Sequence, residues 1–252
     1  MFLDMFESEE IKANYIANKR LDLEIARLID VYESELKMLD ISSEYFNESE
    51  GDSEAVDAAK QNKFVELMSN IYEAILKSMA KFFERISDIF SKKDETSGLS
   101  TEDFLKSNTG KVELHYTLNR AQDTATKKIA EGNALIKKLS KATKIDDRVI
   151  EKYVEDSADF LSNMKATDVV EAGAIVHAYS KYTDTYKEFK DGGLKSIVKN
   201  VTDPASKGQS KRVLLAIGRY YQDMNTIYTE AYSQMKDLKR KTYENMKQKG
   251  QE

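Results

Sequence analysis

The sequence predicts an all-α fold, an elongated bundle of about six to eight helices with long helices near both ends. One proline and ten glycines among 252 residues supply too few turns for a sandwich or a barrel. Charged residues make up 33% and hydrophobic residues 40% of the chain, which is typical of long, thin helical proteins. Long segments also repeat apolar residues at helical spacing, as described below for each element.

The first helix is expected over about residues 8–40, because apolar residues recur there every three or four positions. A break is expected at 42–54, and residues 44–57 hold six acids and no base. This acidic segment is either a docking site for a basic partner or a solvated loop whose acids lie near the positive end of the next helix. The apolar residues of the first helix are Ile11, Tyr15, Leu21, Ile25, Leu28, Tyr32, Leu36 and Leu39.

The second helix is expected over about residues 53–91, and its most apolar part is FVELMSNIYEAILKSMAKFFERISDIF, residues 64–90. Two adjacent apolar rows give this helix a wide apolar face, which is typical of a bundle helix that packs against at least two others. Those other helices belong to this chain or to a partner. The candidate interface residues on this face are Phe64, Ile71, Ile75, Phe82, Phe83, Ile86 and Phe90.

The clearest internal boundary is a loop predicted at 91–101. It divides the chain into an N-terminal helical hairpin, residues 1–92, and a helical bundle, residues 100–252, with one continuous domain as the alternative. Ser100 is a good N-cap for a short helix over 101–106.

A helix is expected over about 111–141, with apolar groups at both ends. Its middle, residues 119–128, offers only two alanines, and alanine buries little apolar area. We therefore expect this middle to be weakly packed or supported by a partner.

Four more helical segments are expected in the rest of the chain. One begins at Asp146 and ends near 164, and the next is capped by Thr167 or Asp168 and ends near Phe189, before the stop signal DGG at 191–193. A short helix is expected at 194–200, then a loop at 204–208 and a final helix over about 209–247.

Tyr179, Tyr182 and Tyr186 follow one another at helical spacing and complete the set of candidate interface residues. Tyrosine suits an interface because its ring is apolar and its hydroxyl is polar. The same residues also suit a semi-exposed seam between helices of a thin bundle.

The residue types that carry chemistry are scarce. No cysteine is present, which excludes disulfides, Cys-ligated zinc and a thiol nucleophile. Neither His115 nor His177 follows a glutamate by three residues, as di-iron bundles require. The loop at 93–104 has Lys93 and Phe104 where a calcium loop needs carboxylates, and GGLKS at 192–196 lacks the first glycine of a phosphate loop. We expect no metal, no cofactor and no enzymatic activity.

The net charge of −5 makes nucleic acid an unlikely main partner, although residues 236–249 are basic. The acidic start, MFLDMFESEE, does not resemble a signal peptide. No apolar run is long enough to predict a transmembrane helix.

The first ninety residues, and NIYEAILKSMAKFFERISDIF at 70–90 in particular, resemble structural or internal head proteins of tailed bacteriophages. The resemblance implies a non-enzymatic protein assembled in many copies, located in the virion or the host cytoplasm. It also implies trimming after glutamate, for which Ile71-Tyr72-Glu73 and Ile129-Ala130-Glu131 fit the pattern.

Two functions follow from these observations. The leading hypothesis is a structural or assembly protein, a helical component of a phage particle that acts through protein–protein contacts and as a homo-oligomer. The alternative is a protein that binds or perturbs membrane surfaces, suggested by the apolar face at 64–90. Acids and bases are mixed on the polar side of that helix, whereas interfacial helices favour lysine and arginine there.

Overall fold

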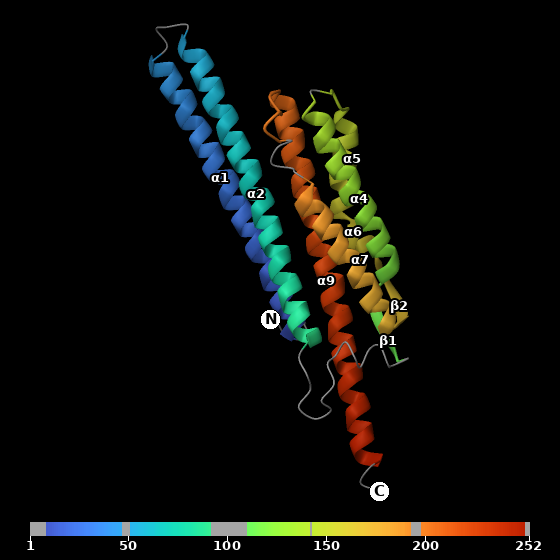
Figure 1. Cartoon of the computed structure of the whole chain (residues 1–252). Coiled ribbons are helices and arrows are strands. Elements are labelled where there is room, and N and C mark those ends of the chain that lie inside the picture. Colours follow the sequence, from blue (N-terminus) through green and yellow to red (C-terminus); the bar gives the residue numbers. More distant parts are fainter. Residues whose placement is uncertain (1–8, 47–50, 92–109, 142, 193–197, 250–252) are drawn as a thin grey trace.

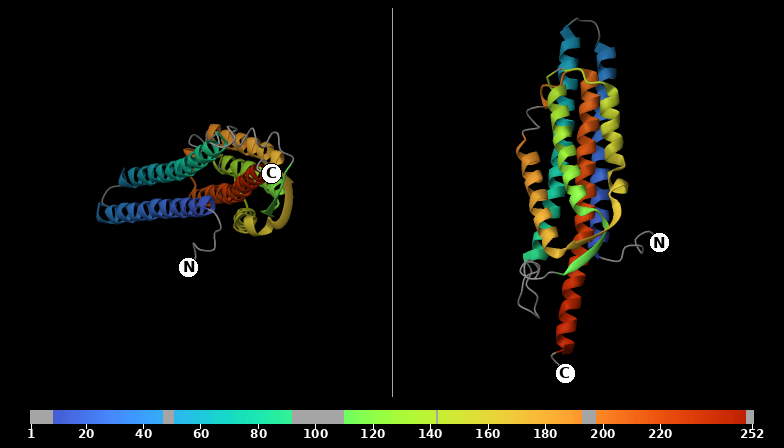
Figure 2. Two further views of the ribbon diagram at one scale, coloured as in Figure 1. Left: turned by 90° about the horizontal axis from the view of Figure 1, so that it is seen from below. Right: turned by 90° about the vertical axis from the view of Figure 1, so that its right-hand side faces the viewer.

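The computed structural model describes residues 9–46, 51–91, 110–141, 143–192 and 198–249. These residues form seven helices and one two-stranded sheet. Figures 1 and 2 show a long bundle in which the helices run roughly along one axis. The expected fold class, an elongated bundle with long helices near both ends, is therefore confirmed.

Helices α1 (Glu9–Phe46) and α2 (Gly51–Ser91) form an antiparallel hairpin. The acidic break is narrower than expected, because α1 continues to Phe46 and α2 already begins at Gly51. At one end the hairpin extends past the other helices (Figure 1). Nearer its base, α1 is tied to α9 by polar contacts, such as Asn14 Nδ2 to Thr226 Oγ1 at 3.2 Å and Gln222 Nε2 to Asp22 Oδ1 at 2.9 Å.

Helix α9 (Pro204–Lys249) is the axis of the bundle and packs against α1, α2, α4, α5 and β1. Its 46 residues correspond to about 70 Å at 1.5 Å per residue. Large side chains on all sides of its middle are buried, among them Tyr220, Tyr221, Met224 and Tyr228. The other elements surround this part of α9 accordingly (Figure 2).

The final helix begins at Pro204, not near residue 209, so the loop expected at 204–208 was wrong. Proline fits the first helical position because its fixed φ suits a helix and its missing N–H has no partner there. Asp203 acts as the cap, since its Oδ2 accepts a hydrogen bond from the Ser206 N–H at 2.8 Å.

A small sheet lies where two helices were expected to begin, near residues 111 and 167. Strands β1 (Lys111–Tyr116) and β2 (Lys165–Glu171) pair antiparallel, with Val112 opposite Val170. Along β1, buried Val112 and Leu114 alternate with exposed Lys111 and Glu113, which is the period of a strand and not of a helix.

Four further helices pack around α9: α4 (Leu118–Leu139), α5 (Asp147–Ala158), the single turn α6 (Phe160–Asn163) and α7 (Ala172–Asp191). The helix expected to begin at Asp146 starts at Asp147, and Asp146 is its N-cap, because its side chain accepts a hydrogen bond from the Arg148 N–H. The helix expected at 146–164 is divided at Asp159.

The middle of α4 is tightly packed, so the expected weak packing was wrong. Ala121 and Ala125 are 0% and 2% exposed, and α4 lies against α9 along much of its length. Small side chains bury little area themselves, but they let two helices approach closely, so that the larger side chains of α9 fill the space.

One continuous apolar core joins α2, α4, α5, α7 and α9. The division into residues 1–92 and 100–252 stays a prediction, although the two parts share this core. The loop and short helix expected at 91–106, and most of the helix expected at 194–200, lie outside the described residues. No helix in the described ranges is long and apolar enough to cross a membrane.

Candidate functional site

The apolar face of α2 and the tyrosine row of α7 meet each other inside the chain. The ring of Phe83 lies 5.8, 5.3 and 4.9 Å from those of Tyr179, Tyr182 and Tyr186. These four aromatic side chains join the two helices, so the helix that covers this part of α2 belongs to the same chain.

Six of the ten candidate interface residues are buried. Phe83, Tyr179 and Tyr186 are only partly buried, and the side chain of Phe90 lies outside the described part. A buried side chain is not available to an external partner, so the buried set forms an internal contact. Its members are Phe64, Ile71, Ile75, Phe82 and Ile86 on α2 and Tyr182 on α7.

The hydroxyl groups of two buried tyrosines, Tyr182 and Tyr228, have hydrogen-bond partners within the bundle. Tyr182 donates a hydrogen bond to Asn225 Oδ1 at 2.6 Å, and Tyr228 donates one to Gln122 Oε1 at 2.9 Å. The two rings stack at 4.9 Å. Burial raises the pKa of both hydroxyls, which keeps them protonated as hydrogen-bond donors. These tyrosines therefore fix the position of α7 on α9.

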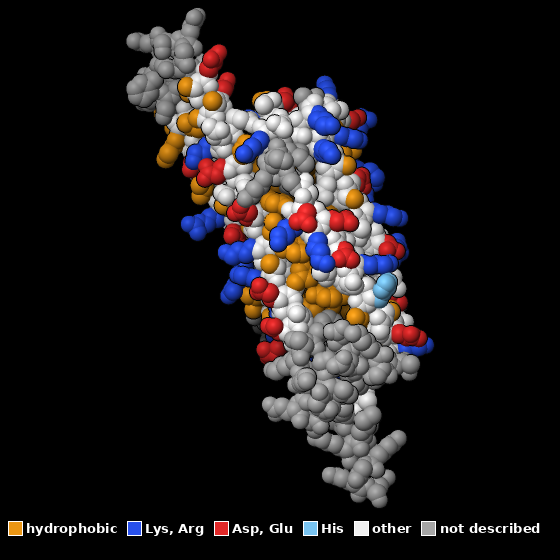
Figure 3. All heavy atoms as spheres, in the orientation of Figure 1, with side chains coloured by type: hydrophobic (Ala, Val, Ile, Leu, Met, Phe, Trp, Pro, Cys, Tyr) orange, Lys and Arg blue, Asp and Glu red, His pale blue; other side chains and the backbone are white. Residues whose placement is uncertain are grey.

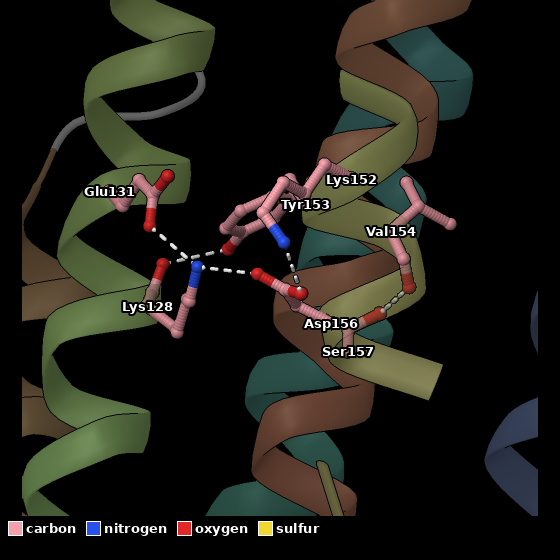
Figure 4. Close-up of polar contacts among 7 residues, drawn as sticks. All are labelled: Lys128, Glu131, Lys152, Tyr153, Val154, Asp156 and Ser157. Carbon is pink, nitrogen blue, oxygen red and sulfur yellow. Dashed lines mark hydrogen bonds and ion pairs between the residues drawn. The ribbon is translucent and has the colours of Figure 1, made fainter. Parts of the chain in front are cut away.

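A polar cluster joins α4 to α5 (Figure 4). Lys128 Nζ contacts Asp156 Oδ2 at 2.8 Å and Glu131 Oε2 at 3.1 Å, and Lys152 Nζ contacts Asp156 Oδ1 at 3.3 Å. The Tyr153 hydroxyl donates to the Lys128 carbonyl oxygen at 2.7 Å.

The electrostatics of this cluster favour a structural role. The hydrogen bond from Lys128 lowers the pKa of Asp156. Burial lowers the pKa of Lys128, but its hydrogen bonds to Asp156 and Glu131 outweigh burial and raise it. A catalytic lysine needs a lowered pKa to become a base or a nucleophile. Lys128 is instead held as a cation, so the cluster is an ion-paired connection between two helices.

A second polar cluster lies where α9 passes the sheet. Glu230 is 6% exposed, and its Oε1 accepts hydrogen bonds from the His115 N–H at 2.8 Å and from the His115 ring at 2.5 Å. Its Oε2 has no hydrogen-bond partner among the described residues. Two turns earlier, burial raises the pKa of Asp223 to about 7.

This second cluster lacks the ligands for a metal. The described residues contain no group of three or more His, Asp or Glu side chains that could hold a metal ion. The Glu230 carboxylate instead fixes the β1 backbone at the irregular step between Leu114 and Tyr116, where the register shifts.

Grooves flank the hairpin, and two of them hold clusters of cations. One, of about 710 Å³, lies between the hairpin and the start of α9, and Phe64, Lys60 and Lys207 line it. The other, of about 510 Å³, runs between α1 and α2. Its floor contains Leu21 and Ala74, and it holds one acid, Glu24. Four cations line it: Arg20, Lys77, Lys81 and Arg85.

The outer face of α1 carries most of the exposed large apolar side chains. Seven such side chains occur in the described residues, and two of them, Val149 and Val169, lie on α5 and β2. The other five lie on α1: Ile16 (40% exposed), Leu23 (70%), Val31 (49%), Met38 (68%) and Ile41 (53%). At 100° per residue, these five fall within a sector of about 80°, and they are called the α1 stripe below.

The α1 stripe was missed by reasoning from the sequence, which considered only the inward face of this helix. Leu21, Ile25, Leu28 and Tyr32 are buried or partly buried as expected. The signal that could have revealed the α1 stripe is the set of apolar residues in this helix that do not belong to the inward face. These residues share the opposite face of α1. A helix with two apolar faces has two surfaces to cover, and the described residues cover one of them.

Comparison of the chain with protein-family models, curated proteins and solved structures gives no match. The function therefore has to be inferred from the described residues.

Proposed function

We propose that the chain is a non-enzymatic structural or assembly protein that acts through protein–protein contacts. The α1 stripe carries the proposal. Five large apolar side chains aligned on one exposed helix face are a feature of interaction surfaces, whereas isolated exposed apolar residues are normal. Figure 3 shows hydrophobic side chains along the outer edge of the hairpin.

The internal packing supports this proposal, because it makes the chain a rigid component for such an assembly. The aromatic contacts between α2, α7 and α9 and the ion pairs between α4 and α5 hold the bundle together. The hairpin projects past the bundle at one end (Figure 1), so it offers its outer face without obstruction. We further propose a phage particle as the assembly, and here the support is the resemblance of residues 70–90 to tailed-phage virion proteins.

The test is mass spectrometry of particles purified from the natural source of the protein, with the chain quantified against the major particle proteins. We expect many copies per particle. A Met38→Lys variant should be incorporated less than a Val169→Lys variant, because both add a charge at an exposed apolar site but only Met38 belongs to the α1 stripe. Absence of the chain from purified particles would contradict the proposed location.

A second candidate function, binding to an anionic membrane surface, rests on the groove between α1 and α2. Its four cations have no ion pair with any described residue, and burial lowers the pKa of Arg85. Co-sedimentation with phosphatidylserine vesicles at low salt tests this candidate. Loss of sedimentation in Lys77→Glu/Lys81→Glu would support it, and no sedimentation of the wild type would exclude it.

A further inference from the structure

We infer that the α1 stripe is the contact between two copies of this chain, which pair antiparallel through α1 about a two-fold axis near Arg27. This inference rests on the proposed function and names the partner of the same surface. It is carried by the order of exposed residues along α1, by their charges and by the position of α1 at an edge of the molecule.

The spacing of positions on the exposed face of α1 is palindromic, whereas the residue types are not. Nine exposed positions follow one another at steps of 3, 4, 3, 4, 4, 3, 4 and 3, and they read the same in both directions from Arg27. They are Ala13, Ile16, Arg20, Leu23, Arg27, Val31, Ser34, Met38 and Ile41. A two-fold contact requires a surface that is complementary to itself, and steps of three and four are those of helices that pack side by side.

The palindrome brings apolar residues together when two α1 helices pair antiparallel. Position i then faces position 54 − i of the second copy, so that Ile16 meets Met38 and Leu23 meets Val31. Because of the two-fold axis, the Ile16–Met38 contact and the Leu23–Val31 contact each occur twice. Ala13 contacts Ile41 at the two ends of the pair. All of the large apolar residues of the stripe thereby become covered by residues of the same stripe.

The charges favour the antiparallel arrangement over the parallel one. A parallel pair would place Arg20 on Arg20 and Arg27 on Arg27, and it would bring together the two acidic segments at 44–57. In the antiparallel pair only Arg27 meets itself. Glu24 and Asp30 of the second copy lie one turn away on either side, within reach of the long arginine side chain.

The second copy has room, because α1 lies at the edge of the molecule in Figure 1 and in the left-hand view of Figure 2. The contact is small. Residues 13–41 span about 42 Å, and at a helix width of about 10 Å the pair would bury on the order of 900 Å², at the lower end of specific interfaces. The dimer should therefore dissociate on dilution, with a dissociation constant in the micromolar range.

Sedimentation velocity of the wild type, from low to high micromolar concentration, tests whether the partner is a second copy. We expect a reversible shift from one chain to two. Leu23→Lys should weaken the dimer by about 100-fold or more, since it removes two buried leucines from the contact. The matched control, Val169→Lys, should dimerise as the wild type does, and circular dichroism should show both variants folded.

Mixed cysteine variants test the register, and the absence of native cysteine makes this simple. A mixture of Ile16→Cys and Met38→Cys should cross-link with a short bifunctional thiol reagent, whereas each variant alone should not. Cross-linking of each variant with itself would overturn the antiparallel register.

The outcomes separate the inference from the proposed function. A wild type that stays monomeric at all concentrations, or a dimer that Leu23→Lys leaves intact, overturns the inference. In either case, the chain's presence in purified particles would still support the proposed function, with the α1 stripe assigned to a different partner protein.

Discussion

Helices α1 and α9 are both long, with 38 and 46 residues, and they lie against each other, yet they are covered very differently. Side chains on every side of the middle of α9 are buried, whereas α1 is covered on one side and bare on the other. Residues of this same chain therefore bury the middle of α9. Among the described residues, the outer face of α1 is exposed and has the composition of a contact surface, so the proposed protein–protein contact is expected at the edge of the bundle.

A matched pair of methionines should give the largest difference between the two helices. Met224 on α9 is 0% exposed and Met38 on α1 is 68% exposed. We expect Met224→Ala to lower the free energy of unfolding by about 2–5 kcal/mol because it leaves a cavity, and Met38→Ala to change it by less than about 0.5 kcal/mol.

Urea denaturation at a protein concentration low enough for monomers measures both methionine variants. Equal losses of stability would show that the outer face of α1 is buried in the monomer, contrary to the comparison.

A pair of glycines tests the close approach of α4 to α9. A Cβ at Gly132 would collide with the Tyr153 hydroxyl and would lie 2.7 Å from Ile217 Cγ1, whereas a Cβ at Gly173 would meet nothing within 4 Å. Gly132→Ala should therefore destabilise the protein by about 1–3 kcal/mol. Gly173→Ala in α7 should be neutral or stabilise it by up to about 1 kcal/mol.

Thermal denaturation of the two glycine variants gives the sign of each effect. If Gly132→Ala were as stable as the wild type, α4 and α9 would not be packed as closely as described.

Burial of Asp223 on α9 disfavours the charged form of its carboxyl group. The free energy of unfolding is therefore expected to depend on pH. Burial raises the pKa of this carboxyl group to about 7, opposed by the charge of Arg219, while the unfolded chain keeps a value of about 3.9. The folded state therefore holds a proton that the unfolded state loses between these values, and this contribution to stability falls as the pH rises from about 4 to 7.

Asp223→Asn should remove that pH dependence. We expect it to stabilise the protein by on the order of 1–2 kcal/mol at pH 8, relative to the wild type, and to make no difference below pH 4. Unfolding curves across this pH range would contradict the account if the variant were less stable at pH 8.

The sequence predicted the bundle because that prediction depends on averages over many residues. Scarce prolines and glycines and long apolar periods favour helices whichever residue begins or ends them. The local errors arose where few residues decide the structure. The six residues of β1 are too short for their period of two to stand out beside a long helix, and Pro204 was taken for a loop signal although proline also suits the first turn of a helix.

The site was harder to predict than the fold because exposure depends on tertiary packing. The wide face of α2 and the row of tyrosines on α7 are apolar enough to bind a partner, but in the folded chain they cover each other. The α1 stripe has fewer apolar residues than either of them. Only the arrangement of the other helices shows that nothing in the described chain covers it.

The most direct test of the contact between two α1 helices is the cross-linking of Arg27→Cys with itself. This position lies on the two-fold axis, so a single cysteine variant should form a covalent dimer in high yield with a short thiol reagent, and the yield should fall when Leu23→Lys is added. A cysteine at Lys152, which is exposed on α5, serves as the control for random collisions. If Arg27→Cys cross-links no better than Lys152→Cys, the outer face of α1 is not the contact between two copies.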